Sequence, residues 1–125
     1  MILISPISTI IYVTTRFAAF HRWVDAPAEV YFLREYHRHL FHVKLSLRVA
    51  HKNRELEFFM VQKELVDFVR LTLEGEYFSY SCEQLAQLIA NRFAALYGLS
   101  VVAAVEVSED GENGAVLTFG MGKEN

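Results

Sequence analysis

The sequence predicts an α+β fold, in which one four-stranded antiparallel sheet carries two helices on one face. Alternating apolar and polar residues indicate two long strands near the start of the chain and two shorter ones around a turn-rich loop near its end. Between these two pairs, the apolar residues change to helical spacing, so the order is β-β-α-α-β-β. The expected strands are residues 7–20, 36–50, 101–107 and 115–119, and the expected helices are residues 60–74 and 81–97.

The composition is that of a folded globular protein. Of the 125 residues, 53% are hydrophobic and 22% are charged, so we expect one domain over residues 1–125 that buries its own core. The net charge is −3 and acids and bases are interspersed, so no surface for nucleic acid is expected. The single cysteine, Cys82, excludes an internal disulfide and any zinc site built from several cysteines.

The apolar segment at the start of the sequence does not have the pattern of a signal peptide. Residues 1–7 lack a basic region and a small-residue cleavage site, and Pro6 interrupts them. No apolar run is long enough to cross a bilayer. We therefore expect a cytoplasmic protein that does not associate with membranes.

The first strand, residues 7–20, is rich in β-branched and aromatic residues between Ile10 and Thr15, which fit a pleated surface. Its length suits a central strand or a strand bent by a bulge. A turn signal around Pro27 follows, within a loop of residues 22–35 that is longer than a hairpin needs. Long loops of this kind are usually functional or disordered.

The second strand, residues 36–50, has apolar side chains on one parity and polar side chains on the other. A polar turn is expected at residues 51–54, and a short extended return at residues 55–59. The first helix, residues 60–74, carries an apolar stripe that should pack against the sheet, and Gly75 is its stop signal.

The second helix has a start signal and a stop signal. Ser81 is expected to cap it, because Gln84 three residues later completes a capping box. Gly98 follows the last helical residue. The loop at residues 110–114 is rich in turn residues and predicts a hairpin between the last two strands. Because such a sheet has two open edges, we expect copies of the chain to pair edge to edge.

Two histidines of the second strand are predicted to share one side of the sheet. His37 and His39 lie on the parity of the apolar residues that follow, and side chains at positions i and i+2 of a strand point the same way. They can therefore converge on one metal ion. The alternative is a pair of core or interface histidines that only form hydrogen bonds.

A third histidine strengthens the interpretation as a metal site. His21 continues the apolar face of the first strand, so pairing of the two strands can bring it to His37 and His39. Three neutral imidazoles with an open position form a catalytic type of zinc site. The alternative is that His21 ends a strand near the surface. His42 faces the opposite side of its strand and His51 lies in a turn, and neither is assigned a role.

The histidine pattern resembles that of a known family. Phe20-His21-Arg22, followed by His37-Arg38-His39-Leu40-Phe41, is similar to the 6-pyruvoyl-tetrahydropterin synthase and 6-carboxy-tetrahydropterin synthase family. The resemblance covers roughly residues 14–117, in the right order. It implies a T-fold that assembles into an oligomeric barrel with sites between subunits. It also implies zinc as the cofactor, bound by His21, His37 and His39.

Two further segments carry the resemblance. Ser81-Cys82-Glu83 resembles the opening of the family's second helix, and Ser108-Glu109-Asp110 resembles the strand end where a glutamate binds the guanidine-like edge of a pterin. The resemblance thus assigns Glu109 to substrate binding. A carboxylate can accept two parallel N–H bonds from an aminopyrimidinone edge. From the residues alone, the alternative is that Glu109 is one acid of an acidic turn.

Two features of the family are missing. Family enzymes carry a catalytic cysteine shortly before the histidine pair, whereas residues 31–35 contain no cysteine. They also carry an Asp-His pair between the helices, whereas residues 75–80 contain neither residue type. We therefore expect the family's acid–base groups to be absent, while zinc binding and pterin-edge recognition could be retained.

Five other residues are weak candidates for moving a proton near the zinc. Cys82 lies near a helix N-terminus, where the helix dipole favours a thiolate. Asp25, Glu29 and Glu35 lie in the loop of residues 22–35, which begins and ends beside the histidines and is the expected lid over the metal. For each candidate, a solvated or structural role is the stronger alternative. The five are Glu35, Tyr36, Cys82, Asp25 and Glu29.

The resemblance implies a zinc-dependent lyase or isomerase that acts on a pterin- or purine-like small molecule, in queuosine or biopterin biosynthesis. The nearest reaction type is the carbon–oxygen lyase of the 6-carboxy-tetrahydropterin synthase type. One alternative is a catalytically inactive T-fold protein that binds a ligand or serves as an oligomeric scaffold. Another is a structural oligomer whose histidines are incidental.

Overall fold

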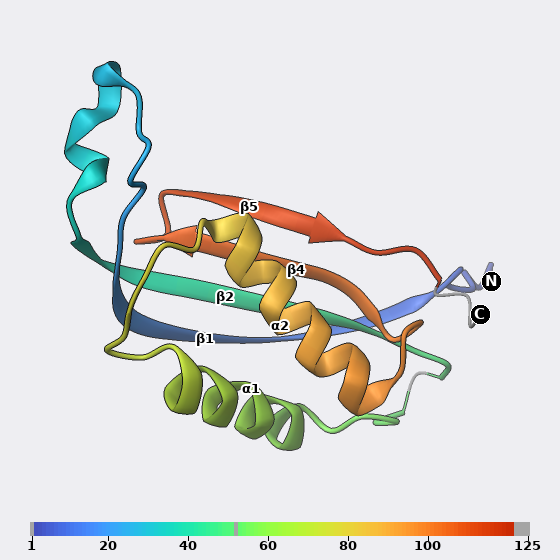
Figure 1. Ribbon diagram of the computed structural model, residues 1–125. Helices are drawn as coiled ribbons and strands as arrows, with labels where there is room; N and C mark the ends of the chain where they lie inside the picture. The colour runs from blue at the N-terminus through green and yellow to red at the C-terminus, as the bar shows by residue number, and fades with distance from the viewer. Residues whose placement is uncertain (1, 52, 122–125) are drawn as a thin grey trace.

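The computed structural model describes residues 2–51 and 53–121, and the fold is α+β, as predicted (Figure 1). One curled sheet carries the long helices, and a short 3-10 helix stands apart from it (Figure 1). In chain order, the elements are β1 (Thr9–His21), η1 (Ala28–Arg34), β2 (His37–Val49), α1 (Phe58–Thr72), β3 (Tyr77–Phe78), α2 (Cys82–Tyr97), β4 (Val102–Glu109) and β5 (Asn113–Thr118).

The sheet contains five strands in the order β3-β1-β2-β4-β5, so the prediction of four strands was wrong. The additional strand, β3, is two residues long and runs parallel to the end of β1. It forms because the chain between the helices passes beside β1, where the Phe20 N–H donates to the Glu76 carbonyl at 2.9 Å. A strand of this length is too short for an alternating pattern to reveal it.

The two long strands, β1 and β2, pair antiparallel over their full lengths. Thr9 lies opposite Val49 at one end, and His21 lies opposite His37 at the other. Apolar side chains of one parity therefore face the helices along both strands. This register also brings the end of β1 beside the start of β2, so that His21 and His37 lie next to each other.

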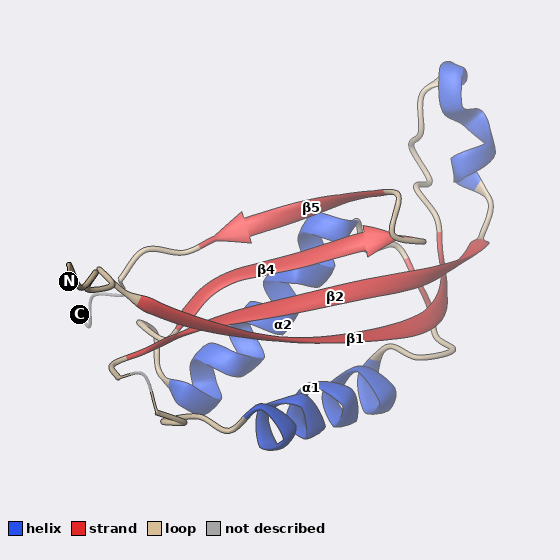
Figure 2. Ribbon diagram, turned by 180° about the vertical axis from the view of Figure 1, so that it is seen from behind, coloured by secondary structure: helices blue, strands red, loops and turns tan. Residues whose placement is uncertain are grey.

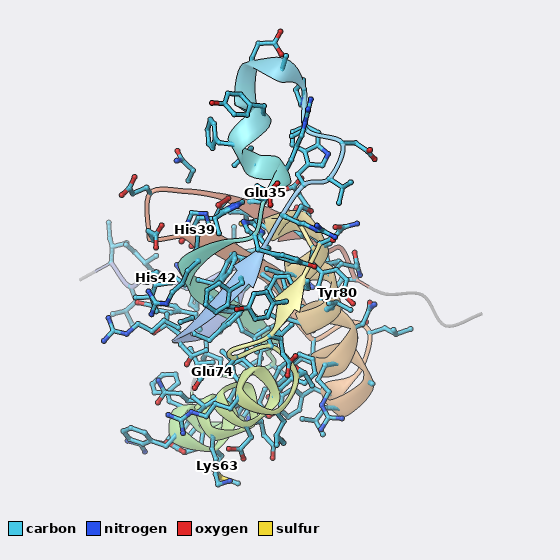
Figure 3. All side chains as sticks on the ribbon, turned by 60° about the vertical axis from the view of Figure 1, so that its left-hand side comes forward. Glu35, His39, His42, Lys63, Glu74 and Tyr80 are labelled. Carbon is cyan, nitrogen blue, oxygen red and sulfur yellow. The ribbon has the colours of Figure 1, made fainter. Side chains whose placement is uncertain are left out.

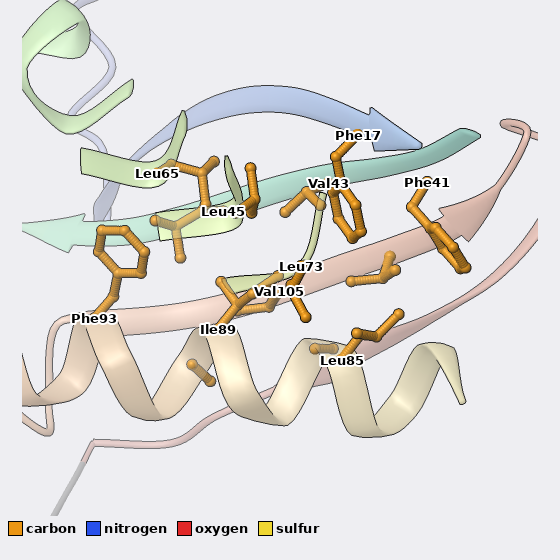
Figure 4. Packing of buried hydrophobic residues seen from close by; sticks show 14 of the residues in the cluster. Phe17, Phe41, Val43, Leu45, Leu65, Leu73, Leu85, Ile89, Phe93 and Val105 are labelled. Carbon is orange, nitrogen blue, oxygen red and sulfur yellow. The ribbon is translucent and has the colours of Figure 1, made fainter. Parts of the chain in front are cut away.

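Both α1 and α2 cover the same face of the sheet, as predicted. In Figure 1, α2 crosses in front of the sheet, and in Figure 2, which is viewed from the opposite side, it lies behind the strands, while α1 lies along β1 in both views. Large apolar side chains from both helices and three strands fill the space between these layers (Figure 4). The side chains in this core that are almost fully buried include Phe17, Phe41, Val43, Leu45, Leu65, Leu85, Ile89, Phe93 and Val105. Within the described residues, no helix has the length and apolar character needed to span a membrane.

The start of α2 was predicted correctly, whereas the start of α1 was not. The capping box of α2 is confirmed, because the Gln84 N–H donates to Ser81 Oγ at 3.1 Å and the Ser81 N–H donates to Gln84 Oε1 at 2.9 Å. The extended return expected at residues 55–59 is wrong, because α1 already begins at Phe58. The Glu57 carboxylate accepts the Met60 N–H at 3.0 Å and caps this helix, so the helical turn replaces a strand there.

The loop expected at residues 22–35 forms an arm that contains η1 and projects from one end of the sheet (Figure 1). Its two sides are joined by hydrogen bonds from the Trp23 N–H to the Leu33 carbonyl and from Arg34 Nε to the Ala26 carbonyl, both at 2.7 Å. None of the residues in η1 is buried. The arm therefore extends away from the sheet, and only its base borders the site described below.

Candidate metal centre

Three histidines meet at the end of the sheet from which the arm projects. His21 ends β1 and His37 begins β2 directly opposite it, while His39 lies opposite Ala19. The ring of His21 lies 4.6 Å from that of His37 and 5.2 Å from that of His39, measured between centroids. Figure 3 shows His39 at this end of the molecule, below the arm and near Glu35. The structure thus brings together the three residues that the strand patterns selected.

Each of these histidines has an oxygen atom next to its Nδ1 atom. Carbonyl and carboxylate oxygens accept hydrogen bonds, so the tautomer with the proton on Nδ1 satisfies each of these contacts and leaves Nε2 with a lone pair. A histidine that binds a metal through Nε2 is usually held in this way. The three contacts are His21 Nδ1 to the Tyr80 carbonyl at 3.0 Å, His37 Nδ1 to the Glu35 carbonyl at 2.9 Å, and His39 Nδ1 to Asp110 Oδ2 at 2.7 Å.

A carboxylate completes this group. One ligand atom from each of the three histidines and from Glu109 lies within 4.8 Å of the others. Glu109 Oε2 lies 2.8 Å from His39 Nε2 and 3.4 Å from His21 Nε2. Because β4 ends at Glu109 beside β2, the sheet itself brings this carboxylate to the histidines.

The donor set fits a metal ion. His37 Nε2 is buried and has no hydrogen-bond partner, and an unpaired polar atom in a buried position is unfavourable. A metal ion between the four groups would use this lone pair. Three imidazoles and a carboxylate are ligands that Zn²⁺ accepts in tetrahedral geometry, at distances of about 2.0–2.2 Å. The group can therefore hold a metal, while the role of each residue as a ligand stays a prediction.

A cleft of about 810 Å³ opens beside the histidines. It lies between the base of the arm, the start of α2 and the turn from β4 to β5, and Figure 1 shows these segments at the same end of the sheet. This volume is within the range of about 300–1,000 Å³ that is typical of small-molecule sites. Its polar lining includes His21, Arg22, His37, Glu83 and Glu109.

Four of the candidates for proton transfer do not line the cleft. Tyr36 is partly exposed, and its ring contacts the Tyr77 ring at 5.2 Å and lies under the Arg22 guanidinium at 4.4 Å. Glu35 is exposed, and its contact with the site is the backbone carbonyl that accepts from His37. Asp25 and Glu29 are exposed on the arm. A catalytic role for any of them stays a prediction.

Cys82 lies in the lining of the cleft, but its thiol is not poised to ionise. Burial first, and then the nearby Glu109 and Glu83, raise the pKa of this thiol to about 12. Burial and negative charge therefore outweigh the start of α2, whose dipole would favour the thiolate. At neutral pH we therefore expect the Cys82 thiol to be protonated, and a catalytic role for it stays a prediction.

This environment predicts slow alkylation of Cys82 in the folded protein. A rise in pKa from 9.0 to about 12 lowers the thiolate fraction at pH 8 roughly a thousandfold. We expect iodoacetamide to modify native Cys82 about three orders of magnitude more slowly than the same cysteine in urea. Mass spectrometry of the time course measures both rates. Equal rates in the folded and unfolded protein would contradict this description of the thiol.

The three groups that contact the histidine Nδ1 atoms were not selected from the sequence. Asp110 holds His39, and the Leu40 N–H and then His39 lower the pKa of this carboxyl group below its usual value. The backbone carbonyls of Glu35 and Tyr80 hold the other two rings. Asp110 could have been considered from the sequence, because it is an acid next to Glu109 in a turn. The two backbone carbonyls could not, because any residue type supplies a carbonyl oxygen.

The remaining histidines lie outside this group. His42 lies on the opposite parity of β2, where Gly111 approaches its ring. His51 is exposed, and its Nε2 lies 3.5 Å from Glu55 Oε1. Neither belongs to the group of possible metal ligands found in the described residues.

Comparison with known proteins identifies the fold. No family model matches the sequence, and no curated protein matches it. Among solved structures, 6-pyruvoyl tetrahydropterin synthase from Caenorhabditis elegans matches with a TM-score of 0.69 at 14% identity, over 89% of this chain and 95% of that one. The chain has the fold of 6-pyruvoyl tetrahydropterin synthase. The resemblance seen in the sequence is therefore confirmed at the level of the fold.

A second solved structure extends this result. The uncharacterized protein WS1659 from Wolinella succinogenes matches with a TM-score of 0.77 at 13% identity, over 90% of this chain and 99% of that one. The fold of this chain thus matches nearly the whole length of both solved structures. At such identities the likeness concerns the fold, and the chemistry of this chain must be argued from its own residues.

Proposed function

We propose that this chain is a zinc-binding T-fold protein that binds a pterin- or purine-like small molecule beside the metal. The observation that carries the proposal is the unpartnered, buried Nε2 atom of His37, next to two further histidines whose Nδ1 atoms are held by oxygens. Rings held in this way present their Nε2 atoms to a common point. The adjoining cleft is large enough for a bicyclic ligand.

Glu109 has two possible partners in this site. Its carboxylate lies at hydrogen-bond distance from His39 and can serve as a fourth metal ligand. It also lines the cleft, where it can accept two N–H groups from the edge of a pterin or purine. If a metal is bound, His21, His37 and His39 would hold it, and the ligand edge and the metal would compete for the Glu109 carboxylate.

We propose a lyase or isomerase reaction for this centre. Zinc would supply Lewis-acid polarisation of oxygen atoms on the bound ligand. The held imidazoles keep their lone pairs directed inward, and the cleft orients the ligand. As an alternative to binding the ligand edge, Glu109 would accept a proton from a group bound beside the histidines. Cys82, with its raised pKa, takes no part in this proton transfer.

The second candidate function is ligand binding or scaffolding without catalysis. Residues 31–35 contain no cysteine and form part of an exposed arm, and the cysteine that lines the cleft is protonated. In either function, we propose assembly into a barrel with sites between subunits. Open edges support this assembly, since β5 is an edge strand and β3 pairs with only the last two residues of β1.

Metal content and ligand binding test the proposal together. We expect the untagged protein to contain about one zinc per chain by mass spectrometry, and to bind a pterin such as neopterin, measured by its fluorescence. Glu109→Gln should weaken pterin binding at least tenfold, because it removes the negative charge and replaces one of the two acceptor oxygens with an NH₂ donor that would face an N–H group. Glu106→Gln is the matched control, since Glu106 is exposed on the opposite parity of the same strand.

Each outcome of this experiment separates the candidates. Zinc and pterin binding with conversion of the pterin supports the enzyme, and binding without conversion supports the ligand-binding protein. Zinc binding without pterin binding overturns the proposed ligand class. If the folded wild-type protein binds no zinc from a buffered zinc solution, the proposed metal function is wrong.

A further inference from the structure

Asp110 connects the turn between β4 and β5 to the second strand through three hydrogen bonds. Its Oδ2 atom accepts from His39 Nδ1 at 2.7 Å, and its Oδ1 atom accepts the Leu40 N–H at 2.9 Å. Its own N–H donates to the Leu40 carbonyl at 2.8 Å. Its φ of 57° lies in the left-handed region, which aspartate and asparagine tolerate better than most residues.

The support of His39 differs from that of the other two histidines. Backbone carbonyls hold the Nδ1 atoms of His21 and His37, whereas a carboxylate holds that of His39. A carboxylate fixes the tautomer and the orientation of an imidazole and increases the basicity of its other nitrogen. His39 is also the ring whose Nε2 lies nearest to Glu109 Oε2, so its orientation matters for the whole group.

We propose that Asp110 is a positioning residue, which holds His39 with the proton on Nδ1 and thereby presents Nε2 to the metal. This inference rests on the proposed metal function. Asp110 acts through His39 and is not itself among the groups that could hold the ion. Two neighbouring acids at the end of β4 therefore contact the proposed metal centre. Glu109 lies beside Nε2 of His39, and Asp110 contacts Nδ1 of the same ring.

A purely structural role of Asp110 makes a different prediction. If Asp110 only ties the turn to β2, any residue that keeps the bond to Leu40 should preserve zinc binding. Asparagine keeps the Oδ1 acceptor for the Leu40 N–H and tolerates the same backbone conformation. Its NH₂ group, however, would face His39 Nδ1 and donate to it. That contact favours the tautomer with the proton on Nε2, which cannot bind the metal through that atom.

The test compares Asp110→Asn with Glu112→Gln, an exposed acid in the same turn. Zinc affinity is measured by competition with a chromophoric chelator, and stability by urea unfolding of the metal-free forms. We expect Asp110→Asn to bind zinc about 10–100-fold more weakly, while its metal-free form unfolds near the wild-type urea concentration. Glu112→Gln should bind zinc as the wild type does.

A measurement on the wild-type protein tests the proposal even if the variant does not fold. In ¹⁵N-labelled, zinc-loaded protein, the His39 resonances should show a protonated Nδ1 and a metal-bound Nε2. A proton on Nε2, or zinc affinity of Asp110→Asn within twofold of the wild type, overturns the role of Asp110 alone. A wild-type protein that binds no zinc overturns the metal function and this inference with it.

Discussion

Replacing His37 with alanine is expected to lower zinc affinity by about a hundredfold or more, because it removes a buried ring nitrogen that has no hydrogen-bond partner among the described residues. The metal-free variant should be as stable as the wild type or slightly more stable, since the substitution removes an unsatisfied buried polar atom. Chelator competition measures the affinity, and urea unfolding with and without a chelator measures the stability.

His42→Ala is the matched control for this experiment. His42 lies on the same strand but on the opposite parity, outside the group of possible ligands. We expect it to leave zinc affinity unchanged. Two results would contradict the assignment of His37: retention of wild-type zinc affinity in His37→Ala, or an equal loss in the two variants. A large loss of metal-free stability in His37→Ala would indicate a structural histidine instead.

Replacing Phe41 with alanine is expected to cost about 3–5 kcal/mol of unfolding free energy, because its ring is fully buried. The ring packs against Phe17 at 5.3 Å and against His21 and His39 at 5.1 and 5.9 Å between centroids. Loss of the ring therefore removes a support beneath two of the three histidines. We expect zinc affinity of the folded variant to fall as well, which chelator competition measures at urea concentrations where the variant remains folded.

Phe93→Ala separates core stability from support of the site. Phe93 is equally buried, but it lies on α2 at the opposite end of the core from Phe41 (Figure 4). Its truncation should cost a similar 3–5 kcal/mol or so. Zinc affinity of its folded form should stay at the wild-type value. Equal effects of the two substitutions on zinc affinity would mean that Phe41 contributes only general stability.

The elements that could be predicted from the sequence are those in which a periodic pattern coincides with burial. The strand pattern around residues 36–50 and the capping box at Ser81 and Gln84 both correspond to the structure. Patterns of this kind are local, because the same periodicity that buries one face of an element also forms its backbone hydrogen bonds. The start of α1 was missed because Glu57 caps the helix with a carboxylate, without the serine or threonine of a capping box.

The candidate site was predictable to a different extent for each residue. His37 and His39 could be paired from their i, i+2 spacing alone, and His21 followed from the expected antiparallel pairing of the two strands. Glu109 was expected to bind a ligand edge, and the structure also places it against the histidines. The position of a carboxylate at a strand end depends on the register between β2 and β4, which no single segment specifies.

The sequence by itself determined the α+β class, the two long paired strands and the set of three histidines, because alternation and helical spacing are properties of neighbouring residues. Only the tertiary structure decided which groups hold those histidines. The Tyr80 carbonyl comes from the segment between the helices, and the Asp110 carboxylate comes from the last hairpin. Such contacts arise where segments distant in the chain pack at one end of the sheet. The same packing buries Cys82 beside Glu109 and raises its pKa, which its place at a helix start did not predict.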